Sequence, residues 1–164
     1  DMAQDGQAPM HRPSAVIEAK NSWGSEMEFV DCGGGYGDGV VSYLVDAGAD
    51  PIRVVPAGKA SSQKYFNKRT EMAFLFRDWV RAGGILPNDP DLVKECSGMT
   101  YSLKGAKLFL EPTEKIKDRI KRSPDKFASI CQTFALPDMP AGSSDMPELA
   151  HLHDRQSSDW DIDD

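Results

Sequence analysis

The stretch that decides the fold is FVDCGGGYGDGVVSYLVDAG, residues 29–48, followed by the short apolar run IRVV at residues 52–55. Residues 26–31 alternate in the manner of a strand that ends in an aspartate, and the five glycines after it are too many for regular structure. Apolar residues then return at helical spacing, at Val40, Val41, Leu44 and Val45. Strand, helix and strand within about thirty residues predict a βαβ unit with parallel strands.

Further elements are predicted on both sides of this unit. A short helix begins at Ala15, and the longest helix runs over residues 62–82, with Gly83 and Gly84 after its end. Residues 88–91 open another helix, and residues 99–103 and 106–111 read as the two strands of a β-hairpin. The last helix, which carries Phe127 and Ile130 on one face, begins at Ser123 as N-cap with Pro124 at its first position.

Composition limits the class of protein. The chain has 164 residues, of which 40% are hydrophobic and 27% charged, as expected for one globular domain. It has no apolar run of the roughly 18 to 20 residues that a membrane span needs, and no signal-peptide pattern, so we expect a soluble intracellular protein without a membrane partner. Three cysteines without a CxxC pair support neither a disulfide framework nor a zinc site, and we expect small buried thiols.

The net charge of −7 is concentrated at the C-terminal end. Residues 136–164 hold eight acidic residues against one basic residue, which leaves 18 of each sign in residues 1–135. We therefore expect an irregular lead-in at 1–14, a domain at 15–137 and a flexible acidic tail at 138–164. In a neutral body, contacts to a phosphate backbone would come from a local basic cluster, namely Lys115, Lys117, Arg119, Lys121 and Arg122.

Two aspartates are candidate ligands of a metal ion. Asp31 ends a strand at the edge of the sheet where open α/β proteins place their sites, and Asp125 lies in the first turn of the last helix. If they converge, their oxygens would favour Mg²⁺ or Mn²⁺, and a pair of such ions hydrolyses phosphodiesters. The alternative interpretation is structural: Asp31 as a turn residue and Asp125 as a partner of the helix dipole.

Nucleotide-binding motifs are weak here. The glycine run contains GxGxG but not GxGxxG, and no Lys-Ser or Lys-Thr pair follows it as a P-loop requires. We therefore do not expect ATP or NAD binding in this chain.

Taken together, five motifs resemble the nuclease domain of the large terminase subunit of tailed bacteriophages, the motor protein that packages and cuts viral DNA. They occur in the order typical of that family across residues 15–137. The motifs are FVD with GGYGDGVV (29–41), YFNKRTEM (65–72), Trp79 with GGILP (83–87), LE (110–111), and SPD with TFA (123–135).

The resemblance implies an α/β fold, a ribonuclease H-like mixed sheet flanked by helices, and divalent-metal-dependent endonucleolytic cleavage of double-stranded DNA. It makes Asp31 and Asp125 the catalytic metal ligands of a two-metal Mg²⁺ or Mn²⁺ site, and it makes Lys68 and Arg69 structural or DNA-proximal residues. The implied partners are double-stranded DNA, the terminase ATPase region and small subunit, and the portal protein through the acidic tail. The implied location is the cytoplasm of the host cell.

The chain also departs from the family pattern. It lacks the opening strand that carries the first metal aspartate, it has Ala128 where relatives often have a second acid, and it has Thr113 in place of a common lysine. The alternative hypothesis is therefore a truncated or inactive nuclease-like module that interacts with DNA, the portal or the motor.

Overall fold

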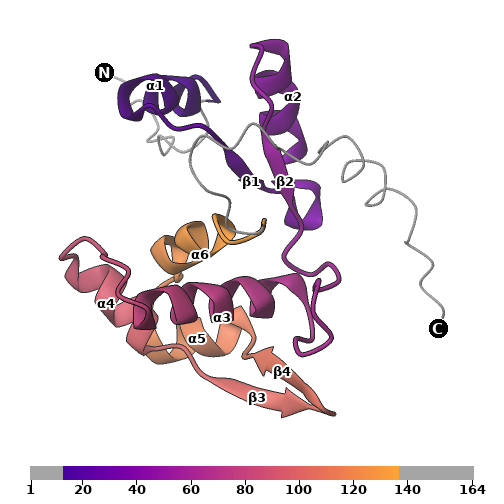
Figure 1. The fold of residues 1–164 in the computed structure, drawn as a ribbon, viewed down its shortest axis with the longest axis vertical. Helices are drawn as coiled ribbons and strands as arrows, with labels where there is room; N and C mark the ends of the chain where they lie inside the picture. The colour runs from indigo at the N-terminus through magenta and orange to yellow at the C-terminus, as the bar shows by residue number, and fades with distance from the viewer. Residues whose placement is uncertain (1–12, 137–164) are drawn as a thin grey trace, which may run out of the picture.

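A computed structural model describes residues 13–136 of the chain. The predicted tail at 138–164 and nearly all of the predicted lead-in at 1–14 lie outside the described residues. The described part is an α/β structure in which a long helix, α3 (Lys68–Arg81), runs through the middle. A small βαβ part lies on one side of α3, and a β-hairpin with two further helices lies on the other (Figure 1).

The predicted βαβ unit is confirmed. Strand β1 (Phe29–Asp31) pairs in parallel with β2 (Ile52–Val54), with Asp31 opposite Val54, and α2 (Asp38–Asp46) connects them. Helix α1 (Pro13–Trp23) precedes the unit and runs further than the sequence indicated, through the residues expected to break it. Strand β1 is correspondingly shorter than the alternation over 26–31 suggested.

The glycine run packs tightly against the carboxyl end of β1. Gly34 and Gly35 have φ of 66° and 80°, a left-handed conformation that glycine adopts without steric cost. Gly37 is required for space, because a Cβ on it would lie 2.1 Å from the carbonyl oxygen of Asp31. These residues turn the chain from β1 into α2 directly beneath the Asp31 backbone.

Helix α3 begins later than the pattern predicted. The sequence suggested residues 62–82, but Asn67 is the N-cap and accepts a hydrogen bond from the Thr70 amide at 3.0 Å. Residues 61–66 form a loop instead, in which Tyr65 bridges to Leu108 of the hairpin. The predicted end is confirmed, since the helix stops at Arg81 before the two glycines.

The remaining elements follow the predicted order. Helix α4 (Pro90–Ser97) is capped by Asp89, strands β3 (Tyr101–Lys104) and β4 (Lys107–Leu110) form the hairpin, and α5 (Thr113–Ile120) leads to α6 (Asp125–Gln132). The prediction of Ser123 as the N-cap of α6 is wrong. Pro124 occupies the cap position, and the Ser123 hydroxyl donates a hydrogen bond to Asp125 instead of to a backbone amide.

The hydrophobic core lies where α3 meets β2, β4 and α6. Helix α6 packs against both β1 and α3, so it joins the βαβ part to the rest of the fold (Figure 1). The buried core residues are Val54, Met72, Ala73, Phe76, Leu110, Phe127, Cys131 and Ala135.

The predicted α/β class is confirmed, but the described strands form two separate two-stranded sheets, β1 with β2 and β3 with β4. The isolated bridge between Tyr65 and Leu108 attaches the loop before α3 to β4. Within residues 13–136 no strand precedes β1. None of the helices in this range is long and apolar enough to cross a membrane.

Candidate functional site

A cavity of about 240 Å³ opens at the carboxyl end of β1 and contains both candidate aspartates in its wall. Asp31 is exposed, and its Oδ1 accepts a hydrogen bond from the Gly33 amide at 2.8 Å. Its Oδ2 accepts a second hydrogen bond, at 3.0 Å, from the side-chain amide of Gln132 on α6. The strand therefore delivers the carboxylate to the cavity, and the glycine loop and α6 fix its orientation.

Asp125 reaches the same cavity from the first residue of α6. Its Oδ1 accepts a hydrogen bond from the Ser123 hydroxyl at 2.5 Å. Gln132, which holds Asp31, lies seven residues further along the same helix, and Ala128 lies between them on the cavity wall. Because residues seven apart share a helix face, α6 presents one carboxylate and the anchor of the other to a single space.

The NKRTE motif at residues 67–71 places the positively charged side chain of Arg69 in the wall of this cavity. The Thr70 hydroxyl is fully buried and accepts a hydrogen bond from the Leu110 amide at 3.1 Å, which ties the start of α3 to β4. The Glu71 carboxylate is also buried and accepts hydrogen bonds from the Ser61 and Ser62 amides and from Lys68. Arg69, which directly precedes Thr70, lines the cavity and donates to the Glu111 carbonyl at 2.8 Å.

The wall of the cavity carries both a positive charge, on Arg69, and negative charges, on Asp31 and Asp125. Burial lowers the pKa of Arg69 from its ordinary value, but a guanidinium remains protonated at neutral pH. Arg69, Thr113 and Asp125 lie in the first turns of α3, α5 and α6 and line the cavity, so the positive ends of three helix dipoles lie near its wall. This arrangement suits an anion and offsets the repulsion between the two carboxylates.

The oxygen donors that line the cavity are of the kind that hard divalent cations prefer. Carboxylate oxygens of Asp31 and Asp125, the Ser123 hydroxyl and the Gln132 amide oxygen are the ligand types that Mg²⁺ and Mn²⁺ prefer. No cluster of three or more His, Cys, Asp or Glu side chains that could hold a metal ion occurs among residues 13–136. A second cation would need a further carboxylate, so the two-metal site stays a prediction.

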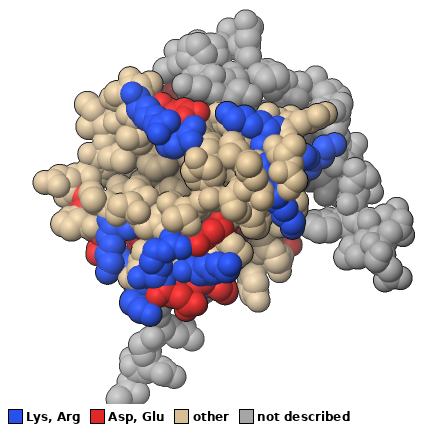
Figure 2. Space-filling model, turned by 90° about the horizontal axis from the view of Figure 1, so that it is seen from below, with Lys and Arg blue, Asp and Glu red and all other residues tan. Residues whose placement is uncertain are grey.

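Most of the predicted DNA-binding side chains make contacts within the protein. Arg119 pairs with Glu111, Arg122 pairs with Asp91 at 2.7 Å and with Glu95 at 3.1 Å, and Lys68 pairs with Glu71 at 2.8 Å. On the face seen in Figure 2, Lys and Arg side chains form separate groups, some of them beside Asp and Glu, rather than one continuous basic patch. Several of the side chains predicted to bind DNA are therefore already engaged in ion pairs with other described residues.

Three members of the predicted basic cluster are more available. Lys115 and Lys117 are exposed on α5, with Lys117 4.0 Å from Glu114. Lys121 follows α5 in a left-handed conformation, with φ of 61°, and is also exposed. Neither Lys115 nor Lys121 forms an ion pair with another described residue.

Sequence reasoning missed Gln132 as a site residue. Its spacing of seven residues from Asp125 is the signal that places both on one helix face. Nothing in the sequence indicated that the partner of Gln132 would be Asp31, 101 residues away.

The described fold is that of the nuclease domain of a phage large terminase subunit. Solved structures with this fold include the nuclease domain of the large terminase subunit gp2 of bacterial virus Sf6, with a TM-score of 0.53, 14% identity, and coverage of 77% of this chain and 72% of that one. A mutant of that domain solved with manganese gives the same values. A mutant solved with calcium gives a TM-score of 0.55 at 13% identity, with coverage of 77% and 71%.

No protein-family model and no curated protein matches the sequence. At this level of identity the solved structures show the fold alone, and the expected resemblance is confirmed to that extent.

Proposed function

We propose that this chain is a nuclease region of a phage large terminase, which cleaves double-stranded DNA during genome packaging. The observation that carries the proposal is that Asp31 and Asp125, 94 positions apart in the sequence, line one cavity in a fold shared with terminase nuclease domains. The hydrogen bonds that orient each carboxylate toward that cavity support the same conclusion.

In this proposal Asp31 and Asp125 hold Mg²⁺ or Mn²⁺ through carboxylate oxygens. The Sf6 domain was solved with manganese and, separately, with calcium, which supports a preference for hard divalent cations in this fold. Bound there, the cation would supply activation of water and stabilisation of the leaving oxygen of a phosphodiester. Gln132 keeps the Asp31 carboxylate turned toward the cation, and the Gly33 amide fixes its other oxygen.

Arg69 is the residue we assign to the scissile phosphate. Its guanidinium has five donors, of which the described contacts use one, toward the Glu111 carbonyl. The remaining donors lie in a wall that also carries both carboxylates and the first turns of three helices. A bidentate guanidinium–phosphate contact at this point would hold the substrate backbone against the cation.

DNA outside the cavity would be held by Lys115, Lys117 and Lys121, which are exposed along and after α5. Lys68, Arg119 and Arg122 are proposed as secondary contacts, because each must first be released from an acidic partner. The ATPase region and small subunit of the terminase, and the portal protein, are the proposed partners in the host cytoplasm.

One observation favours a second candidate function, an inactive nuclease-like module. The cavity supplies two carboxylates rather than the larger acidic cluster of a two-metal nuclease. Such a module would keep the fold and the exposed lysines for binding DNA or motor partners while lacking cleavage.

Plasmid cleavage separates the two candidates. The full chain should nick or linearise supercoiled DNA in Mn²⁺, and Asp31→Asn and Asp125→Asn should each lower the rate by at least about 100-fold, the range seen for loss of a charge that stabilises a transition state. Asp118→Asn, an exposed aspartate on α5, is the matched control and should keep the activity. Absence of cleavage at any protein concentration, with DNA binding retained, would instead establish the inactive module.

A further inference from the structure

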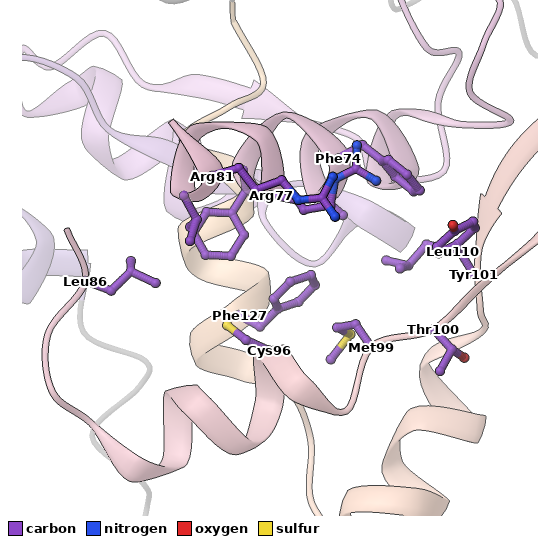
Figure 3. A pocket seen from close by; sticks show the side chains of 13 residues that line it. Phe74, Arg77, Arg81, Leu86, Cys96, Met99, Thr100, Tyr101, Leu110 and Phe127 are labelled. Atoms are coloured by element: carbon purple, nitrogen blue, oxygen red, sulfur yellow. The ribbon is translucent and has the colours of Figure 1, made fainter. Parts of the chain in front are cut away.

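A second, largely apolar cavity lies along α3, and of its lining residues only Phe127 also lines the aspartate cavity. It has a volume of about 380 Å³ and is walled by side chains of α3, the end of α4, the start of the hairpin and Phe127 of α6 (Figure 3). Phe74, Val80, Leu86, Met99 and Tyr101 supply much of its apolar surface. We call it the α3 groove.

The α3 groove remains open to solvent although its walls are hydrophobic. Val80 is 37% exposed and Tyr101 is 59% exposed, so apolar surface continues from the cavity onto its rim. Leaving such a surface in water costs free energy in proportion to its area, and continuous apolar patches of this kind mark interaction sites. A ligand for the groove must therefore carry apolar side chains.

The rim of the groove carries positive charge. Arg77 lies over the Phe74 ring at 4.3 Å and pairs with Asp78 at 2.6 Å, so one of the two rim arginines is partly neutralised. Arg81 is exposed at the end of α3 and forms no ion pair with another described residue. An apolar floor with a cationic rim complements a segment in which apolar and acidic residues are interspersed.

The chain itself contains such a segment beyond the described part, at residues 145–154. The Phe134 ring packs 5.7 Å from Phe76 and 5.9 Å from Trp79, so the chain leaves the described structure against α3, the helix that forms a wall of the groove. Residues 137–144 connect this point to the segment, and at about 3.3 Å per extended residue they can span roughly 26 Å, whereas Phe76, which Phe134 contacts, itself lines the groove.

We propose that the segment DMPELAHLHD, residues 145–154, docks into the α3 groove of the same chain. Met146, Leu149 and Leu152 are its apolar residues of suitable size, and Asp145, Glu148 and Asp154 are interspersed with them as partners for the rim arginines. This inference does not rest on nuclease activity. It gives the acidic end of the chain a binding site within the molecule. A partner protein that uses the groove would have to displace the docked segment.

Disulfide trapping in the full chain tests the proposal, because Cys96 already lines the groove as a half-buried free thiol. Under mild oxidation, Leu149→Cys or Ala150→Cys should form an intramolecular disulfide with Cys96 at least about tenfold faster than Ser157→Cys, which belongs to the same C-terminal segment but lies outside the docking residues, a larger difference than its slightly longer tether gives. Adding Cys96→Ser must abolish the adduct.

Charge reversal on the rim of the groove, combined with the Leu149→Cys variant, provides a second measurement. Arg77→Glu combined with Arg81→Glu should slow trapping at Leu149→Cys by about tenfold, whereas Lys115→Glu combined with Lys117→Glu, the same charge change on α5, should leave the rate unchanged. Equal trapping rates at residues 149, 150 and 157 would overturn the proposal. A disulfide between two chains would also overturn it, because the occupant would then be a second copy.

Discussion

At the scale of single residues, the candidate site depends on one glycine as much as on the two aspartates. Gly37 is buried against the backbone of Asp31, where no side chain can be accommodated without moving the carboxyl end of β1. Gly39, two positions later, is exposed and has open space around its Cα hydrogens. The same substitution at these two positions should therefore have opposite effects.

Gly37→Ala should destabilise the protein by about 1–3 kcal/mol or more, because its Cβ would overlap the Asp31 carbonyl. Gly39→Ala should be neutral or stabilise by up to about 1 kcal/mol, since alanine favours the helix in which residue 39 lies. Urea unfolding of both variants gives the two free energies. Equal stability of the two variants would show that the loop does not pack as described.

The site could be predicted only in part from individual residues. Asp31 and Asp125 were predicted as a pair, and the structure brings them into one cavity, although no spacing rule connects positions so far apart. Arg69 was predicted to lie near DNA, but the sequence did not indicate that it faces the same cavity. Gln132 was missed because an uncharged amide carries no signal until its partner is known.

At the scale of elements, local sequence patterns predicted the helices and strands correctly where local backbone preferences determine the structure. The βαβ unit, the hairpin and the start of α4 were predicted from periodicity, glycine placement and the Asp-Pro pair, and all three are present. The beginning of α3 was wrong because Tyr65, which fits the helical period, instead joins a loop that hydrogen bonds to the hairpin. Tertiary contacts overrode periodicity at that point.

Thr70 is the contact that joins α3 to β4. Its hydroxyl donates to Asn67 at 2.7 Å and accepts from the Leu110 amide, so Thr70→Val preserves the shape and removes both bonds. Because the Leu110 amide would be left without a partner at a buried position, we expect a loss of about 1–3 kcal/mol.

Thr133→Val is the matched control for Thr70→Val. Its hydroxyl is exposed and only donates to the Ile130 carbonyl within the last turn, so the change should be nearly neutral. Thermal or urea unfolding of the two variants compares them directly, and equal losses would mean that the α3–β4 link does not stabilise the fold.

At the scale of the whole molecule, ion pairs hold the helices together and make stability depend on pH. The Lys126 ammonium lowers the pKa of Asp89, the Arg122 guanidinium lowers the pKa of Asp91, and Arg119 lowers the pKa of Glu111. The first pair connects the N-cap of α4 with α6, the second connects α4 with the segment between α5 and α6, and the third connects the residue after β4 with α5.

A carboxyl group whose pKa is lower in the folded state stabilises the protein above its unfolded pKa, about 3.9 for Asp and 4.3 for Glu. That contribution is lost as the pH falls through the lower, folded value. The free energy of unfolding should therefore drop as the pH is lowered below about 4. Lys126→Met, which removes the partner of Asp89, should make this drop smaller. Identical urea midpoints at pH 7 and pH 3.5 would contradict the ion-pair arrangement.

Binding of a divalent cation by Asp31 and Asp125 together, as proposed, can be measured directly. Isothermal titration of the full chain with Mn²⁺ should reveal at least one site, weakened by at least about tenfold in Asp31→Asn and in Asp125→Asn, since each change removes a charged oxygen ligand. Asp118→Asn should bind as the unaltered chain does. Absence of Mn²⁺ binding to the unaltered chain, or an affinity that survives both site substitutions, would contradict the account.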